Sequence, residues 1–474
     1  MAENFFTSRL PEYEGDGPTL RQQAARCCKS IDIGTAVLPK PLCIKDWDER
    51  TQEDNGDDGE NGTAQVPQAD FRLPPIENER IAGATIEAGP EDHDHAHSSG
   101  TRYARILSSE FNSIVIEHHL KWAPLCHAEP GPLPDQSPAD RLGRYDFHSA
   151  DIMVDWALAR KMKIKGHVLC WHVTTPPLVE DLSPEEVREQ LRRHIFTTMG
   201  HFRGRIRMWD VVNESLAPDG TLAENVFLRK LGPGYIEDCF RWAHEADPDA
   251  FLIYNDNKVE GMGGPNAAKS DGFYNLLRDL VKRGVPIHGA GIQAHFNAAG
   301  TGRGRPPTPS MVRNQIRRIG DLGLKVNISE LDVRVSKLPP NLQQLAQKQI
   351  YHDIIAAALT EPSFDGIWLW GFTDRHTWVS HFYYDDSPLI FDENYGRKNS
   401  YYGMRDALST VAPGGTVGGG LGPYLESDYD EDGNRWGHLW MQPEPAEEDY
   451  AVSAGGGGGA GAGDRRPDWL QSDA

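Results

Sequence analysis

The chain has 474 residues, a formal net charge of −22 and 38% hydrophobic residues, among them 12 tryptophans. This acidic balance argues against nucleic acid and anionic membranes as partners, because both are bound by clustered Lys and Arg. No apolar run reaches the roughly 18 residues that a membrane-spanning helix needs, so none is predicted. The opening MAENFFTSRLPEYEGDG lacks the basic and apolar regions of a signal peptide, and the sequence leaves the compartment open.

Changes in composition divide the chain into segments. Residues 1–24 form an N-terminal segment, residues 25–410 are predicted to form one large domain, and residues 411–474 form an acidic and Gly-rich low-complexity tail. Residues 38–100 are an acidic insertion with little apolar periodicity, which predicts disorder. The short tract His93–His97 within it is interpreted as solvated rather than as a metal site.

The large domain alternates short apolar runs with helical patterns. The runs predicted as buried strands are residues 31–37, 111–117, 163–171, 206–214, 251–256, 287–295, 324–333 and 364–372. Strands that alternate with helices are typical of parallel βαβ units. The pattern predicts an α/β fold, a single (β/α)8 TIM barrel with a long insertion after its first strand and a flexible C-terminal tail. A doubly wound sheet is the alternative, but its Gly-rich phosphate-binding fingerprint is absent from residues 31–37.

Two helices carry clear start signals. Ser183 is a predicted N-cap, Pro184 suits the first helical position and Glu186 completes a capping box. One face of this helix then bears an apolar residue every four positions, at Val187, Leu191, Ile195 and Met199. A second helix, near residues 233–245, is predicted to open at Pro233.

Polar residues concentrate at the carboxyl ends of the predicted strands, where barrel enzymes place their active sites. Glu214 ends the run 206–214, and Glu330 follows the apolar run 326–329. A single glutamate at a strand end is often a surface residue or an ion-pair partner. Two on different strands, amid tryptophans and histidines, indicate instead two carboxyl groups that face one cavity. Cleavage of a glycosidic bond needs such a pair, one to protonate the leaving oxygen and one to attack or to activate water.

Six motifs, in this order, resemble those of glycoside hydrolase family 10, the endo-β-1,4-xylanase family. They are IEHHLKW (116–122), GHVLCWH (166–172), WDVVNE (209–214), IQAH (292–295), ISELDV (328–333) and LWGFTDRHTW (369–378). The resemblance implies that residues 25–410 form a catalytic barrel. It also implies a retaining glycosidase that cleaves internal β-1,4-xylosidic bonds of xylan by double displacement. Glu214 is then the general acid/base and Glu330 the nucleophile.

The resemblance implies roles for further residues as well. Those implied to contact the sugar chain are Glu117, Lys121, His172, Asn213, Gln293, His295, Trp370 and Trp378. Asn213 is expected to donate a hydrogen bond to a sugar 2-hydroxyl. His295, oriented by Asp332, is expected to bond Glu330 and keep it ionised. Neither a cofactor nor a metal is implied, and no Cys/His spacing suggests a zinc site.

Three positions depart from the family pattern. His118 stands where Asn is usual, Thr174 where Gln is usual and Leu178 where Trp is usual. Substrate preference is therefore less strongly implied than mechanism, although xylan is the expected partner. The alternatives are the same mechanism on another β-linked polysaccharide, or a catalytically weak carbohydrate-binding barrel, which the presence of both glutamates argues against.

Overall fold

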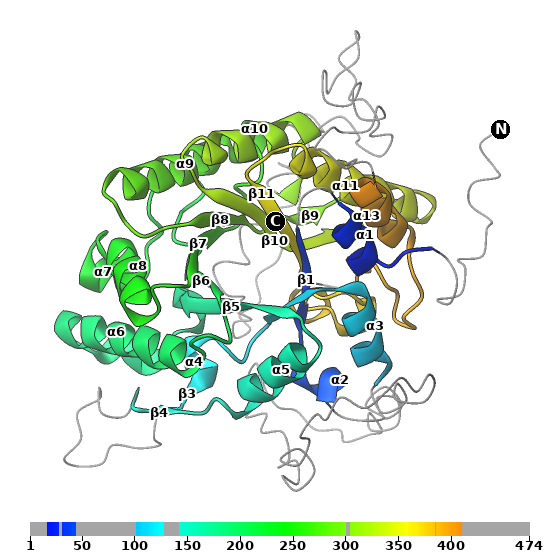
Figure 1. Ribbon diagram of the computed structural model, residues 1–474. Coiled ribbons are helices and arrows are strands. Elements are labelled where there is room, and N and C mark those ends of the chain that lie inside the picture. The colour runs from blue at the N-terminus through cyan, green and yellow to red at the C-terminus, as the bar shows by residue number, and fades with distance from the viewer. Residues whose placement is uncertain are drawn as a thin grey trace, which may run out of the picture.

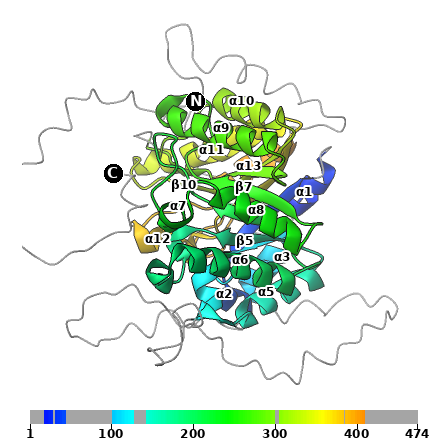
Figure 2. The ribbon, with the colours of Figure 1, turned by 90° about the vertical axis from the view of Figure 1, so that its left-hand side faces the viewer.

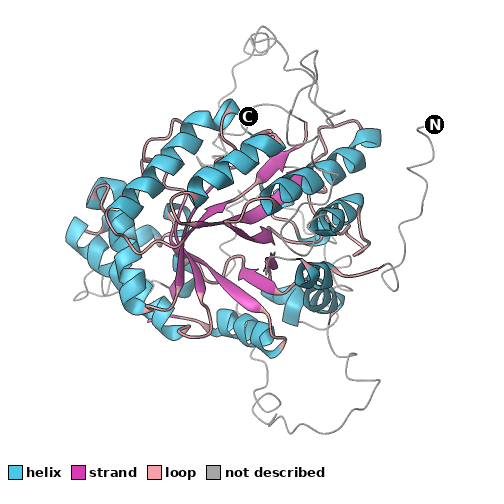
Figure 3. Ribbon diagram, turned by 45° about the horizontal axis from the view of Figure 1, so that its top comes forward, coloured by secondary structure: helices cyan, strands magenta, loops and turns pink. Residues whose placement is uncertain are grey.

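The computed structural model describes residues 17–27, 31–43, 101–127, 142–299, 304–383 and 385–409. Here parallel strands form a closed barrel inside a ring of helices (Figures 1 and 3). The barrel strands are β1 (Asp32–Val37), β2 (Ser113–Ile116), β5 (Lys163–Cys170), β6 (Met208–Asn213), β7 (Phe251–Asp256), β8 (Gly289–Ile292), β10 (Lys325–Arg334) and β11 (Phe364–Leu369). β11 pairs in parallel with both β1 and β10, which closes the sheet. The predicted (β/α)8 barrel is confirmed.

One predicted strand is divided in the structure. The sequence predicted a single strand over 287–295, but β8 ends at Ile292 and β9 (His295–Asn297) pairs separately with the end of β10. The break falls at Ala294, whose φ of +69° is left-handed and incompatible with an extended strand. A small antiparallel pair, β3 (Cys126–His127) with β4 (Arg144–Tyr145), lies outside the barrel sheet.

Helices surround the strands, as the alternating order predicted (Figures 1 and 2). Their bounds are α1 (Leu20–Arg26), α2 (Pro39–Cys43), α3 (Arg102–Glu110), α4 (Trp122–Leu125), α5 (His148–Ala159), α6 (Pro184–His201), α7 (Val226–Leu231), α8 (Tyr235–Ala246), α9 (Ala267–Lys282), α10 (Pro309–Gly320), α11 (Pro340–Leu359), α12 (Val379–Phe382) and α13 (Asn399–Ser409). Short 3-10 turns lie at His172–Thr174, Pro177–Asp181, Gly264–Asn266 and Asp374–His376. None of these described helices is long and apolar enough to cross a membrane.

Helix α6 begins where its capping residues predicted. The Ser183 hydroxyl accepts from the backbone N–H of Glu186, and the Glu186 carboxylate accepts from the backbone N–H of Ser183. Two of the otherwise unpaired amides at the helix start are thereby satisfied. The apolar face at Val187, Leu191 and Ile195 is fully buried against the barrel.

Helix α8 begins later than predicted. The sequence placed its start at Pro233, whereas the helix begins at Tyr235 after Gly234. The preceding helix α7 ends at Gly232, whose φ of +72° is left-handed. The chain therefore makes a turn before the next helix can begin.

The packed domain also begins earlier than the predicted boundary at residue 25. Helix α1 lies against α13 (Figure 1), Leu20 is fully buried, and its backbone N–H donates to Glu110 at 2.9 Å. Helix α2 falls inside the segment predicted as a disordered insertion (38–100), and its Leu42 belongs to the core. The rest of that insertion and the tail 411–474 lie outside the described residues.

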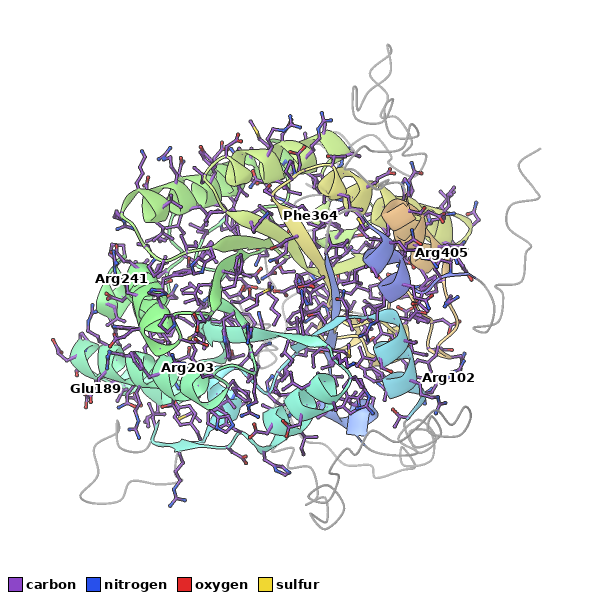
Figure 4. All side chains as sticks on the ribbon, viewed as in Figure 1. Arg102, Glu189, Arg203, Arg241, Phe364 and Arg405 are labelled. Atoms are coloured by element: carbon purple, nitrogen blue, oxygen red, sulfur yellow. The ribbon has the colours of Figure 1, made fainter. Side chains whose placement is uncertain are left out.

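Large side chains pack on both faces of the barrel sheet, Trp368 inside it and Trp209 between the sheet and the helices, and glycines make room for them. A Cβ at Gly34 would lie 2.1 Å from the Trp368 indole, and one at Gly166 would lie 2.2 Å from Trp209. Charged residues of the outer helices, such as Glu189 and Arg241, point to solvent (Figure 4). The interior is thus a packed core, which leaves the chemistry to the strand ends.

Candidate active site

The two predicted catalytic glutamates lie in the same part of the barrel sheet. Glu214 directly follows β6, and Glu330 lies in β10, with β7 and β8 between them. Glu330 lies inside its strand, because β10 continues to Arg334 by pairing with β9. The backbone N–H of Glu330 donates to the carbonyl of Gln293, just beyond the end of β8.

Both carboxylate oxygens of Glu214 accept a hydrogen bond. Gln293 Nε2 donates to Oε1 at 2.8 Å, and Trp171 Nε1 donates to Oε2 at 2.9 Å. The backbone of Glu214 has a φ of +54°, a conformation that L-residues seldom adopt. Such strain persists only where the surroundings impose it, and here both carboxylate oxygens are held by hydrogen bonds.

Glu330 is buried and also held at both oxygens. Asn255 Nδ2 donates to Oε1 at 2.7 Å, and His295 Nε2 lies 3.2 Å from Oε2. Burial alone would raise the pKa of Glu330. The hydrogen bond from His295 and the nearby His167 and Lys165 outweigh it and lower that pKa to about 2. Glu330 is therefore a carboxylate at neutral pH.

His295 is held from its other side by Asp332. The imidazole Nδ1 lies 2.8 Å from Asp332 Oδ2, which also accepts from Trp378 Nε1 at 2.8 Å. Burial lowers the pKa of His295, but Asp332 and Glu330 raise it to about 10. His295 is thus an imidazolium between two carboxylates, with both ring nitrogens donating.

An amide bridge connects the two glutamates. The amide oxygen of Asn213 accepts from Asn255 Nδ2 at 2.9 Å and from Gln293 Nε2 at 3.2 Å. Asn255 also bonds Glu330, and Gln293 also bonds Glu214. The two carboxylates therefore cannot shift independently, and the Asn213 amide nitrogen is left as the donor of that side chain.

The remaining predicted contacts lie beside Glu330. Lys121 Nζ lies 4.7 Å from the ring centre of Trp171 and 5.8 Å from that of Trp370. Burial lowers the pKa of Lys121, opposed by the charges of Glu117, Glu330 and Glu214. Burial raises the pKa of Glu117 to about 7, opposed by Lys121. Cation, carboxyl and indole faces together suit hydroxyls and C–H faces of a sugar.

Two further residues predicted to contact the sugar chain are Gln293 and His172. The Gln293 amide nitrogen donates to Glu214 and to Asn213. Burial lowers the pKa of His172, opposed by the charges of Glu214 and Asp256.

Three site residues were not identified from the sequence. Trp171 and His167 belong to the motif GHVLCWH, from which only His172 was predicted as a site residue. The same motif could have identified both of them. His167 is buried, 3.0 Å from Asp210, and stands edge-on to Trp370. Asn255, near the end of β7, had no motif to mark it, since its role depends on three partners from other strands.

No group of three or more His, Cys, Asp or Glu side chains suited to a metal ion occurs within the described ranges. The tract His93–His97 lies outside them. One of the two glutamates is held by an imidazolium and the other by neutral donors, so the two carboxyl groups stand in different electrostatic environments.

A closed (β/α)8 barrel with two such carboxyl groups at its strand ends defines a glycoside hydrolase. The model of glycosyl hydrolase family 10 matches residues 79–407. The chain belongs to this family.

Curated relatives and solved structures resemble the chain over most of its barrel. "Endo-1,4-beta-xylanase B" of Thermotoga neapolitana is 36% identical over 312 residues, which are 65% of this chain and 83% of the relative. "Beta-1,4-xylanase" of Dictyoglomus thermophilum is 34% identical over 65% of this chain and 85% of the relative. The crystal structure of xylanase 10B from Thermotoga petrophila, in complex with xylobiose, has a TM-score of 0.63 at 30% identity. It covers 83% of this chain and 98% of that one.

Proposed function

We propose that this protein is an endo-β-1,4-xylanase that cleaves internal bonds of xylan by double displacement, with Glu330 as nucleophile and Glu214 as acid/base. The observation that carries the assignment is the Glu330–His295–Asp332 chain, which keeps Glu330 ionised. A nucleophile has to be a carboxylate at working pH, and an imidazolium at 3.2 Å secures this state.

In the first step Glu330 attacks the anomeric carbon while Glu214 gives its proton to the departing glycosidic oxygen. The C–O bond breaks as the glycosyl–Glu330 ester forms. In the second step Glu214, now a carboxylate, takes a proton from water, which attacks the same carbon and releases Glu330. Gln293 and Trp171 each donate to one oxygen of Glu214 and so orient its carboxyl group.

Several side chains support a sugar polymer as the substrate. Asn213 has its amide oxygen fixed by two donors, so that its nitrogen can donate to a 2-hydroxyl. Trp370 and Trp378 offer indole faces beside His295. Xylan is favoured over other β-linked polymers because the curated relatives are named xylanases and a similar structure holds xylobiose.

The test is an assay on xylan and on carboxymethyl-cellulose, with the products sized by chromatography. We expect xylan to yield a mixture of oligosaccharides early in the reaction, which marks internal cleavage. Faster release from carboxymethyl-cellulose would contradict xylan as the substrate. No release from any β-linked polymer, with the Glu330→Ala variant as blank, would contradict the enzymatic assignment.

A further inference from the structure

Two residues beside the active site have a left-handed backbone and share one hydrogen-bond acceptor. Lys258 has a φ of +56° and Ala294 a φ of +69°. The backbone N–H of Lys258 donates to Glu260 Oε1 at 3.0 Å, and that of Ala294 donates to the same oxygen at 2.9 Å. Glu260 is 5% exposed and belongs to the loop after β7. One buried carboxyl oxygen therefore ties together two strained turns from neighbouring strand ends.

Ala294 stands between two residues that bond the catalytic carboxylates. Its predecessor Gln293 donates to Glu214 at 2.8 Å. Its successor His295 lies 3.2 Å from Glu330. Residues two apart in a regular strand point to the same face, but the left-handed backbone of Ala294 interrupts the strand between Gln293 and His295. The directions of the Gln293 and His295 side chains therefore depend on how the backbone of Ala294 is held.

The geometry of the barrel explains why a side chain has to accept this amide. On the β10 side, Gln293 and Ala294 offer their carbonyls to the N–H groups of Glu330 and Asp332. On the β7 side, the N–H of Gln293 still reaches the carbonyl of Asp256, the last residue of β7. The chain then turns away, so β7 supplies no carbonyl for the next amide. Glu260 takes the place of that missing strand partner.

The loop that carries Glu260 is itself anchored. Gln315 Nε2, on α10, donates to the carbonyl of Val259 at 2.8 Å, and the backbone N–H of Met262 donates to the carbonyl of Met311 at 3.0 Å. A Cβ added at Gly261 would lie 2.5 Å from Pro307. The residues on both sides of Glu260 thus contact α10 or Pro307, which lies just before that helix. These contacts fix the position of the acceptor oxygen.

We infer that Glu260 is a positioning residue of the active site: through the Ala294 amide it orients Gln293 and His295, and so aligns both catalytic glutamates. The inference rests on the proposed roles of Glu214 and Glu330. It depends on an acceptor oxygen at that position rather than on a negative charge, because a carbonyl oxygen can accept two amide hydrogens as a carboxylate can.

The test compares Glu260→Ala with Glu260→Gln on xylo-oligosaccharides across pH. Glu260→Ala frees the Ala294 amide, and we expect kcat to fall by roughly 10- to 100-fold with KM changed by less than about threefold. The acidic limb of kcat/KM should move upward by about one pH unit, because a displaced His295 no longer holds Glu330 ionised. Glu260→Gln keeps the acceptor and should stay within about threefold of wild type at unchanged pH dependence.

A second measurement is independent of turnover. The NMR titration of the His295 imidazole should show a lower pKa in Glu260→Ala than in the wild type, because the ring moves from its carboxylate partners. If the wild type degrades no xylan but this titration shifts, the proposed function is wrong and the positioning role stands. If the wild type is active but neither the titration nor the acidic limb moves, the positioning role is wrong.

Glu361→Ala is the matched control for general destabilisation. Glu361 is also a buried glutamate, 2% exposed, but it bonds Arg317 at the opposite end of the barrel. We expect it to lower the melting temperature without moving the acidic limb. Should Glu260→Ala not fold, Glu260→Asp retracts the acceptor by one methylene and should show the same shifts. Equal impairment in Glu260→Gln and Glu260→Ala would overturn the acceptor role.

Discussion

His295 and Glu330 form a partly buried ion pair, with Nε2 of the imidazolium 3.2 Å from Oε2 of the carboxylate. His295 helps to lower the pKa of Glu330 to about 2, and Glu330 helps to raise the pKa of His295 to about 10. Both groups are therefore charged at neutral pH. Asp332 makes this possible, because it compensates the cation on the far side of the ring. The pair is the electrostatic centre of the site, and its pH dependence can be measured.

Replacing His295 by Asn should move the acidic limb of kcat/KM to higher pH. Without the imidazolium, burial dominates and the pKa of Glu330 rises from about 2 to at least its ordinary value of 4.5. Activity that needs the carboxylate is then lost at a higher pH as acid is added. The measurement is kcat/KM between pH 3 and 8. His352→Asn, which removes a His–Asp contact on α11, is the control and should leave the limb in place. An unmoved limb in His295→Asn would contradict the pair's role.

Removing each catalytic carboxylate should affect substrates differently. Glu330→Ala should abolish activity on all of them, because no ester can form. Glu214→Ala should lower kcat/KM on xylan by roughly 10²- to 10⁴-fold. An aryl xyloside with a good leaving group needs little protonation and should lose less than about tenfold. Steady-state rates on both substrate types provide the measurement, and equal losses would remove Glu214 from the acid role.

Hydrolysis should retain the anomeric configuration. The amide bridge through Asn213 holds Glu214 and Glu330 in one arrangement, and we expect their carboxyl groups to lie about 5–5.5 Å apart, as in retaining enzymes. NMR of the first product formed, before mutarotation, would detect the β-anomer. An initial α-anomer would require a water between the carboxylates and would exclude the double displacement.

Thr174→Gln should strengthen substrate binding. Thr174 lies half-buried in the 3-10 turn after Trp171, and Gln extends further and offers both a donor and an acceptor. One added hydrogen bond is worth about 0.5–1.5 kcal/mol, so KM for xylo-oligosaccharides should fall by roughly 2- to 10-fold at similar kcat. Leu178→Trp is a useful contrast, because Leu178 packs against the core and a larger ring should cost stability instead. An unchanged KM in folded Thr174→Gln would contradict a cleft position.

Asp365→Asn should stabilise the protein at alkaline pH. Burial, together with Asp32, raises the pKa of Asp365 to about 7, and its Oδ1 has no hydrogen-bond partner in the described part of the chain. A raised carboxyl pKa costs stability as pH rises from the unfolded value near 3.8 to about 7, and the cost then stays constant. With allowance for solvent screening, about 1–2 kcal/mol should be regained.

The measurement for Asp365→Asn is the melting temperature at pH 4 and pH 8. The variant should melt about 2–4 °C above wild type at pH 8 and close to it at pH 4. Asp249→Asn, at an exposed position, should change neither value. An equal gain at both pH values would show that ionisation of Asp365 is not the cause.

The sequence by itself determined the barrel order of strands and the start of α6, and it predicted Glu214 and Glu330 as the catalytic pair. These depend on local information: apolar runs bounded by turns, the Ser183–Glu186 capping pair, and short motifs that contain the two glutamates. The order of strands and helices then left only a small number of topologies.

Only the tertiary structure decided how the site is held together. Asn255 bonds Asn213, Ser329 and Glu330, and Gln293 bonds Glu214. The break in the predicted strand at Ala294 also depends on the tertiary structure, because the Ala294 amide donates to the distant Glu260. Hydrogen bonds between residues tens of positions apart leave no periodic trace in the chain. They exist only after the barrel has closed and brought the ends of β6, β7, β8 and β10 side by side.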